Sequence, residues 1–413
     1  MNAAGHVGKL IHISGFVDYL SPAIQDIISS ADLVIVQRNI INQGVLDAMR
    51  YWIGLGKPLA VDLDDDYLGL PYSNPAYAFW IGNSAKLDPP PLDTLTSGLR
   101  LTNALLSPNR NILRDWSHVC RGYYMPNYMR DEWWTTLPTR AEMKAKLGLS
   151  DKIVIGWGGS VSHYDSWWGS GIREAAVGIV RTHPEVVFLI CGNDTRIFNQ
   201  LDVPLANKRY HPGVMPGDWP KLVCAFDIGV APLSGTFDQR RSWIKTMEYG
   251  LAGVPWLASD GEPYREHAGL GQLIPPDSAA WESALRQLIA RLPQEQAKAV
   301  ERAAFYRDFL MSKRIADILV VYQMVIDNFN GEHGELPRVL WVKPTVTADP
   351  LPQPEPALPN EPSAKSLADA NYRHLYFLEQ VMPQVRYNDI ELVRAFTYDF
   401  MQIFNDALLK EVM

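Results

Sequence analysis

Residues 226–233 read FDIGVAPL, and residues 240–255 read RRSWIKTMEYGLAGVP. The first, apolar run is typical of a buried strand of a parallel sheet, which is covered on both faces, and Pro232 would end it. Residues 242–251 have the pattern of a helix, which Gly253 and Pro255 would close. The stretch therefore predicts a strand, a turn and a helix, the repeating unit of an α/β fold.

Two side chains of opposite charge, Lys245 and Glu248, lie one turn apart on this predicted helix. Residues at that spacing share a face, so an ammonium for a diphosphate and a carboxylate for ribose hydroxyls would point into one cleft. The alternative is an exposed helical ion pair, worth only about 0.3–0.5 kcal/mol. The preceding strand, the AGVP exit and the WLAS and GEPYRE segments that follow, at 256–259 and 261–266, favour the cleft.

The stretch resembles the C-terminal domain of GT-B glycosyltransferases, specifically the family 4 group, also called glycosyl transferases group 1. In that group a cation on this helix contacts the donor diphosphate and a Glu binds the ribose, which implies these roles for Lys245 and Glu248. The first Glu of the usual Glu-x7-Glu pattern is replaced by Arg240, so the donor sugar stays open. Some relatives have a Lys-Ser step three residues before the Lys. Arg241 and Ser242 match it, which makes Arg241 a second phosphate candidate and Arg240 a further one.

The composition is that of a globular protein with more than one core. The chain has 413 residues, 47% of them hydrophobic and 20% charged, which is too long for one ordinary core. A net charge of −8 gives no overall attraction to nucleic acid or anionic membranes. The three cysteines lack metal or disulfide spacing, and there is no secretory pattern or run of about 20 apolar residues. We therefore expect a cytoplasmic protein without an integral membrane segment.

Apolar runs alternate with helical stretches along most of the chain, which predicts two Rossmann-like domains with parallel sheets. In the first domain the alternating segments are 10–13, 22–29, 33–37, 45–53, 58–63, 101–107, 109–116 and 122–125. In the second, strands are predicted at 153–157, 186–191, 226–231, 254–258 and 272–274, after a helix at 140–147. Two such domains leave a cleft at the carboxyl ends of their strands.

The resemblance and a PNY turn at 126–128 imply the following domain limits. Residues 1–138 form the acceptor domain, 139–310 the nucleotide-sugar domain and 311–330 a crossover helix, part of a long helical region at 297–329 interrupted near Ser312. Eight prolines make 331–366 a semi-rigid linker. Residues 367–413 regain apolar periodicity and predict a helical extension, which packs on the main body or on a second copy to give a homo-oligomer.

A glycine-rich turn follows the first strand of the second domain. Free N–H groups at Gly158, Gly159 and Ser160, before a helix predicted from 165 to 181, suit a phosphate. Many relatives have Gly-x-x-Gly-Ser-x-x-His here, so the resemblance makes these three residues and His163 donor-contact candidates. Such a turn is as often structural, and a lone His in a polar loop is most often solvated.

The acidic run DLDDD at 62–66 ends a predicted strand of the first domain. Such carboxylates invite comparison with the metal-binding Asp-x-Asp of GT-A glycosyltransferases, but those have one nucleotide-binding domain, whereas this chain shows two. Similar acidic turns occur in some family 4-like proteins, so Asp64 and Asp65 are acceptor-site candidates. The alternative is that they cap the next helix. Aromatic clusters near Trp80 and at Trp133 either stack on sugars or bases or pack between domains.

The resemblance implies a retaining, metal-independent transfer from a nucleotide-diphospho-sugar, the co-substrate, with no further cofactor. Arg241 and Lys245 would stabilise the leaving diphosphate. A glycan or glycolipid is the default acceptor. A hydroxymethylated base in DNA is an alternative, because the segments around Asp62 and Asn74 look similar to phage-borne glycosyltransferases. A non-catalytic nucleotide-sugar binding protein or scaffold is an alternative of another class, since the first Glu of the motif is missing.

Overall fold

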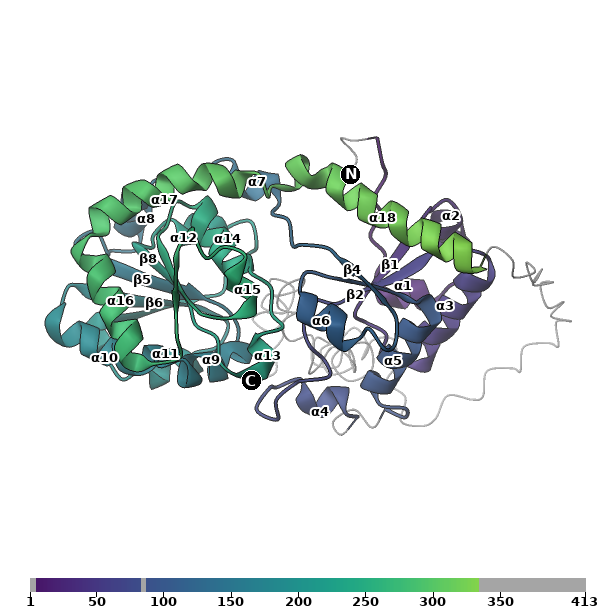
Figure 1. Ribbon diagram of the computed structural model, residues 1–413, viewed down its shortest axis with the longest axis horizontal. Helices are drawn as coiled ribbons and strands as arrows, with labels where there is room; N and C mark the ends of the chain where they lie inside the picture. Colours follow the sequence, from purple (N-terminus) through teal and green to yellow (C-terminus); the bar gives the residue numbers. More distant parts are fainter. Residues whose placement is uncertain (1–4, 83–86, 334–413) are drawn as a thin grey trace, which may run out of the picture.

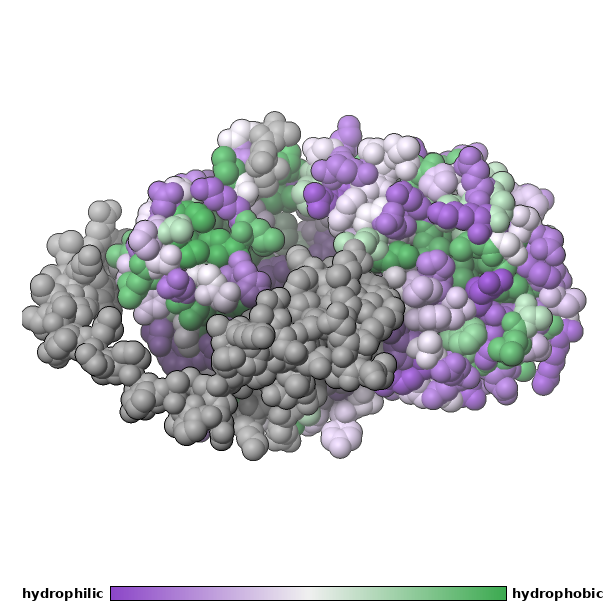
Figure 2. All heavy atoms as spheres, turned by 180° about the vertical axis from the view of Figure 1, so that it is seen from behind, coloured by the Kyte–Doolittle hydropathy of each residue, from purple (hydrophilic) through white to green (hydrophobic). Residues whose placement is uncertain are grey.

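The structure is a computed structural model, which describes residues 5–82 and 87–333. Two lobes, each a parallel sheet flanked by helices, lie side by side (Figure 1). The helical extension predicted at 367–413 and nearly all of the linker predicted at 331–366 lie outside the described residues. In the described part no helix is long and apolar enough to span a bilayer. Where the surface is visible from behind, both hydrophilic and hydrophobic residues are exposed on each lobe (Figure 2).

The first lobe contains a parallel sheet of order β1-β2-β3-β4. In register, Val61 of β2 pairs with Val36 of β1 and Leu105 of β3. Helix α3 fills the core beneath it with Met49 and Trp52. The elements are α1 Ile13–Val17, α2 Pro22–Ser29, β1 Val34–Gln37, α3 Gln43–Gly54, β2 Leu59–Asp62, α4 Tyr77–Trp80, α5 Pro91–Thr102, β3 Ala104–Ser107, α6 Arg110–Asp115 and β4 Arg121–Tyr124.

Two predictions in this lobe are wrong. Residues 10–12 form no strand, because the His12 side chain accepts the N–H of Ser14 and begins helix α1 there. The strand predicted at 101–107 starts only at Ala104. Helix α5 continues to Thr102, and Asn103 ends it in the left-handed conformation, with φ of 50°.

The second lobe contains a parallel sheet of order β10-β9-β8-β5-β6-β7. Helices α10 and α16 cover one face and α14 and α17 the other, with Trp281 and Tyr249 in the respective cores. The elements are α7 Asp131–Trp134, α8 Arg140–Lys146, β5 Ile153–Gly158, η2 Val161–His163, α9 Tyr164–Gly169, α10 Ile172–Thr182, β6 Val186–Gly192, α11 Arg196–Gln200, η3 Leu205–Asn207, β7 Lys208–Pro212, α12 Trp219–Val223, β8 Ile228–Ala231, α13 Gly235–Asp238, α14 Ile244–Leu251, β9 Trp256–Ser259, α15 Glu262–Arg265, β10 Gln272–Ile274, α16 Ser278–Ala290 and α17 Leu292–Arg307.

The predicted strands of this lobe are all present, but the sequence pattern missed one strand and one helix break. Strand β7 reads KRYHP and lies at the sheet edge, where polar residues are tolerated and no apolar run is needed. The helix predicted from 165 to 181 is broken, because Gly171 adopts φ of 88° between α9 and α10.

The chain crosses between the lobes twice, and the two crossings are hydrogen-bonded to each other. Met129 N–H donates to Phe309 O (3.1 Å), and Met311 N–H donates to Met129 O (2.8 Å). The predicted interruption near Ser312 lies at residues 308–310, after which α18 (Met311–His333) runs back along the first lobe (Figure 1). There its Val325 packs against Ala60, Leu106 and Tyr123.

Candidate functional site

A cavity of about 560 Å³ lies where β5 and β6 end, beside the first turn of α14. Ligands of open α/β sheets bind at this edge, because loops leave the strands there and the side chains converge. The wall combines a glycine turn, a cation, a carboxylate and several indoles. Its residues include Tyr128, Trp133, Trp134, Gly158, Gly159, Ser160, Gly192, Asn193, Asp194, Pro212, Val214, Trp219, Lys245, Glu248 and Met311.

Lys245 is held with its ammonium against the glycine turn. Its Nζ lies 2.5 Å from Gly158 O and 5.3 Å from the centroid of the Trp157 ring. The side chain is buried, which rules out the alternative of an exposed helical ion pair. The wall of the cavity therefore contains a lysine ammonium.

Glu248 lies one turn further along α14 and lines the same cavity. Burial raises the pKa of its carboxyl to about 7, and Lys245 and a hydrogen bond with Trp219 oppose that rise. The spacing of Lys245 and Glu248 in the sequence thus correctly predicts two charged groups on one face. Near neutral pH this carboxyl is divided between its protonated and charged forms.

The glycine turn has no room for side chains. A Cβ at Gly158 would overlap the Trp219 ring, and a Cβ at Gly159 would lie 2.7 Å from the Trp157 ring and 3.1 Å from Lys245 Nζ. The N–H of Gly159 already donates to Cys191 O (3.0 Å), which corrects the expectation that it is free for an anion. Gly158, Gly159 and Ser160 all line the cavity beside Lys245.

His163 is buried, so the expectation of a solvated loop histidine is wrong. Its ring lies edge-on to Trp157, with 5.9 Å between the centroids. Burial, together with the nearby charges of Arg241 and Lys245, holds the pKa of the imidazole well below its usual range. Within the described chain its Nδ1 has no hydrogen-bond partner. His163 therefore supplies a neutral ring close to both cations.

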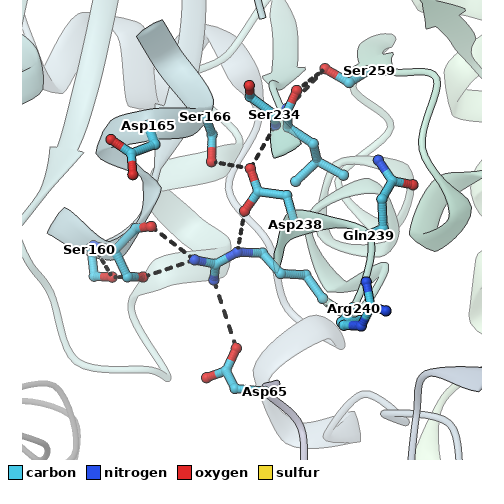
Figure 3. A network of polar contacts seen from close by, with 12 residues as sticks. Asp65, Ser160, Asp165, Ser166, Ser234, Asp238, Gln239, Arg240 and Ser259 are labelled. Carbon is cyan, nitrogen blue, oxygen red and sulfur yellow. Dashed lines mark hydrogen bonds and ion pairs between the residues drawn. The ribbon is translucent and has the colours of Figure 1, made fainter. Parts of the chain in front are cut away.

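Arg241 lies beside the cavity, and it is not among the described residues that line the cavity. Its Nε donates to Asp238 Oδ1 (2.8 Å) and its Nη2 to Ser162 O (2.9 Å). Figure 3 shows that Asp238 also accepts hydrogen bonds from Ser166 and from the backbone of Ser234 (both 2.6 Å). The guanidinium is thus locked in one orientation by a buried carboxylate.

Arg240, the neighbouring residue, points to the other lobe. Its Nε lies 2.5 Å from Asp115 Oδ2 and 3.2 Å from Asp66 Oδ2. Both carboxylates belong to the first lobe, whereas the shortest contacts of Arg241 lie within the second lobe. Nothing in the local pattern of residues 240–241 indicated this division.

The acidic run faces the second lobe across the gap. Asp65 Oδ1 lies 3.9 Å from Arg241 Nη1. Burial and the charge of Asp65 raise the pKa of Asp64 to about 6, against the effect of Arg38 and Arg241. The alternative that Asp64 and Asp65 cap the next helix is wrong, because that helix begins only at Tyr77. In residues 5–82 and 87–333 no group of three or more His, Cys, Asp or Glu could hold a metal ion.

The two aromatic clusters lie in different places. Trp80 is buried in the first core, 4.2 Å from Tyr67 between ring centroids, and so has a packing role. Trp133 lines the cavity, together with Trp219, which the sequence pattern did not indicate. Asn193 was also missed. It follows β6 directly, and its Oδ1 is buried without a partner in the described chain. The sequence could have indicated Asn193, because it is a polar residue directly after a buried strand.

No protein-family model matches the chain, and no curated protein matches its sequence. Solved structures do match. HepE from Anabaena, in complex with UDP and glucose, has a TM-score of 0.54 at 13% identity, over 76% of this chain and 83% of that one. A UDP-forming α,α-trehalose-phosphate synthase from Burkholderia xenovorans has a TM-score of 0.52 at 12% identity, over 76% and 78%. A glycosyltransferase from Rickettsia africae has 0.52 at 11%, over 78% and 85%.

This chain has the GT-B fold. The fold is that of nucleotide-sugar-dependent glycosyltransferases, with two parallel-sheet, Rossmann-like domains, as the sequence pattern predicts. At 11–13% identity the three structures agree with this chain in fold, and the roles of its site residues are inferred from its own geometry. In this GT-B chain the cavity belongs to the second sheet, and the acidic run of the first lobe faces its margin.

Proposed function

We propose that the protein is a glycosyltransferase that moves a sugar from a nucleotide-diphospho-sugar to an acceptor hydroxyl. The observation that carries this proposal is the position of Lys245 and Glu248. They lie on one face of α14 and line one cavity together with the glycine turn. An ammonium and a carboxylate one turn apart match a diphosphate and its ribose. The domain limits belong to the proposal, 139–310 for the donor and 1–138 for the acceptor, with Trp133 contributed to the donor cavity from the end of the second range.

The donor would lie along the cavity with its nucleobase at the end formed by the indoles. Trp133 and Trp219 offer faces on which a base stacks, and the buried Oδ1 of Asn193 offers an acceptor for a base N–H. Glu248 would accept the ribose hydroxyls and Lys245 would hold the diphosphate. Two of the similar structures are described as containing UDP or as UDP-forming, so UDP is the first nucleotide to test.

In the transfer, the bond between the anomeric carbon and the phosphate oxygen breaks, and the diphosphate leaves with the electron pair. The acceptor oxygen bonds to the same face of the sugar, which retains the configuration, and its proton passes to the departing phosphate oxygen. Lys245 and Arg241 would stabilise the charge that develops on the diphosphate. The neutral His163, next to both, would hydrogen-bond the donor sugar without adding charge.

The acceptor would enter from the first lobe, past Asp64 and Asp65. Carboxylates accept hydrogen bonds from sugar hydroxyls, and Asp65 already lies opposite Arg241. A glycan or glycolipid hydroxyl is the acceptor class that we propose. Asp64→Asn and Asp65→Asn should then impair transfer without weakening nucleotide binding.

Calorimetric titration with UDP, GDP, ADP, TDP and CMP tests the donor site and identifies the base. We expect one nucleoside diphosphate to bind selectively. Lys245→Met and Glu248→Ala should each weaken it about tenfold to a hundredfold, because a hydrogen bond to a charged group contributes about 1.5–3 kcal/mol.

The matched control is Lys221→Met, which removes an exposed lysine paired with Asp218 in the same lobe. Its affinity should equal that of the wild type. If no nucleotide binds, or if Lys245→Met and Glu248→Ala bind as the wild type does, the proposed function is wrong.

A further inference from the structure

One buried amide of the first lobe holds the segment that leads into the donor helix. Asn109 caps helix α6, where its Oδ1 accepts the N–H groups of Asn111 (2.8 Å) and Ile112 (3.3 Å). Its Nδ2 crosses to the other lobe and donates to Gln239 O (3.1 Å) and Arg241 O (2.8 Å). The side chain is thus saturated by contacts to both lobes, and Asn109 is buried.

Arg240 lies between those two carbonyls and makes the ionic part of the same contact. Its Nε bridges Asp115 Oδ2 (2.5 Å), at the end of α6, and Asp66 Oδ2 (3.2 Å), after β2. Its Nη1 donates to Thr236 O (2.8 Å), which fixes the arm of the side chain within its own lobe. The Asp66 side chain is 6% exposed with the lobes in contact, and separation of the lobes would remove its partner Arg240.

Arg241 lies next to these contacts of Asn109 and Arg240 between the lobes. Gln239 and Arg241 present their carbonyls, and Arg240 its side chain, to the first lobe. The Nε and Nη2 atoms of Arg241 turn back to Asp238 and Ser162. Lys245 follows in the first turn of α14, which begins at Ile244. A backbone held at 239 and 241 leaves little freedom in where Arg241 and Lys245 point.

We propose that Arg240 is a positioning residue: with Asn109 it clasps residues 239–241 to the first lobe, keeps the lobes closed and sets Arg241 and Lys245 for the diphosphate. The clasp itself rests only on the contacts between the lobes. Its effect on the diphosphate rests on the proposed function. The resemblance to family 4 implies a glutamate at this position, whereas the contacts of Arg240 join the two lobes.

The distance between the lobes tests the clasp directly. Spin labels at Leu20→Cys and Leu205→Cys, 69% and 77% exposed on opposite lobes, report that distance by double electron–electron resonance, and the three native cysteines are buried. We expect one narrow distribution for the otherwise unmodified chain without ligand. Arg240→Gln should broaden it and shift it to longer distances.

Two further variants separate the clasp from a general loss of structure. Asn109→Asp keeps the cap oxygen of α6 but removes the donor and places a second carboxylate beside Glu262, so it should also open the lobes. The exchange of Arg240→Asp with Asp115→Arg should restore the short distance. The matched control is Arg286→Gln, which breaks an Arg–Glu282 pair within the second lobe and should leave the distribution unchanged.

Nucleotide affinity provides the second readout. If opening leaves about a tenth of the molecules closed, the apparent affinity of Arg240→Gln for UDP falls about tenfold, and the exchanged pair regains it. Unchanged distances in Arg240→Gln and Asn109→Asp would overturn the clasp. So would a loss of UDP affinity in Arg240→Gln at unchanged distance, because Arg240 would then contact the donor. If the wild type binds no nucleotide, the proposed function fails and the distances alone decide the clasp.

Discussion

At the residue scale, burial sets the charge of three neighbouring groups in different ways. Lys245 is buried but lies 2.5 Å from a carbonyl, which stabilises its ammonium. Burial, together with the two cations nearby, holds the pKa of His163 well below its usual range and keeps the ring neutral. Glu248 has lost water without gaining enough partners, so its pKa rises to about 7. The proposed diphosphate site thus contains one cation, one neutral ring and one carboxyl that titrates near neutrality.

Glu248→Gln should reveal that titration as a difference in stability. The folded carboxyl has a pKa of about 7, against 4.5 for a glutamate in water, so the folded state binds the extra proton in this interval. Wild-type stability must therefore fall, relative to Glu248→Gln, as pH rises from about 4.5 to 7, by about 1–3 kcal/mol. Urea denaturation at pH 5 and pH 8 measures the change.

The control for that experiment is Glu301→Gln, which makes the same substitution on the exposed side of α17. Parallel pH profiles for the wild type and Glu248→Gln would show that the Glu248 carboxyl titrates normally.

At the element scale, a helix pattern shows where a helix can form but not where a neighbour forces it to stop. The apolar period continues through residues 165–181, yet the helix breaks at Gly171 (φ 88°) because α16 begins against it. A Cβ at Gly171 would lie 2.6 Å from Ser278 N and 2.8 Å from Asp277 C, both backbone atoms. The glycine thus allows a turn and a close approach of two chain segments.

Gly171→Ala should therefore destabilise the protein more than the loss of a positive φ alone does. Gly148→Ala is the matched control, since Gly148 has φ of 67° and a Cβ added there would meet nothing within 4 Å. We expect the control to lose about 1–2 kcal/mol of unfolding free energy, because of backbone strain. Gly171→Ala should lose about 1–3 kcal/mol more, because the added Cβ collides with the backbone of residues 277 and 278. Denaturation curves give both values, and equal losses would contradict the collision.

At the scale of the whole molecule, the last described helix joins the two lobes. Helix α18 follows the second lobe in sequence but buries Val325 against Ala60, Leu106 and Tyr123 of the first. Arg121 pairs with Glu332 at its far end, 2.9 Å apart. The first sheet is therefore covered in part by a helix that follows the second lobe in the sequence.

Val325→Asp should destabilise the first lobe selectively. A buried, unpaired charge costs more than about 3 kcal/mol, whereas Val320→Asp on the exposed face of α18 should stay within about 0.5 kcal/mol. Val325 is 1% exposed and Val320 60% exposed. Hydrogen exchange should show lost protection in β3 and β4 before β5 and β6. Uniform loss across both sheets would contradict a local role of α18.

Local patterns along the chain were enough to predict the features that depend on neighbours in sequence. Alternating apolar runs predicted two parallel sheets, and the three-residue spacing of Lys245 and Glu248 predicted their common face, because helix and strand periods are local. The folded chain alone decides which groups remote in sequence come together. Asp115 pairs with Arg240, Trp133 and Trp219 line one cavity, and Asn109 bonds to Arg241 O of the other lobe. Those contacts join residues far apart in sequence, and tertiary packing, not local propensity, brings them together.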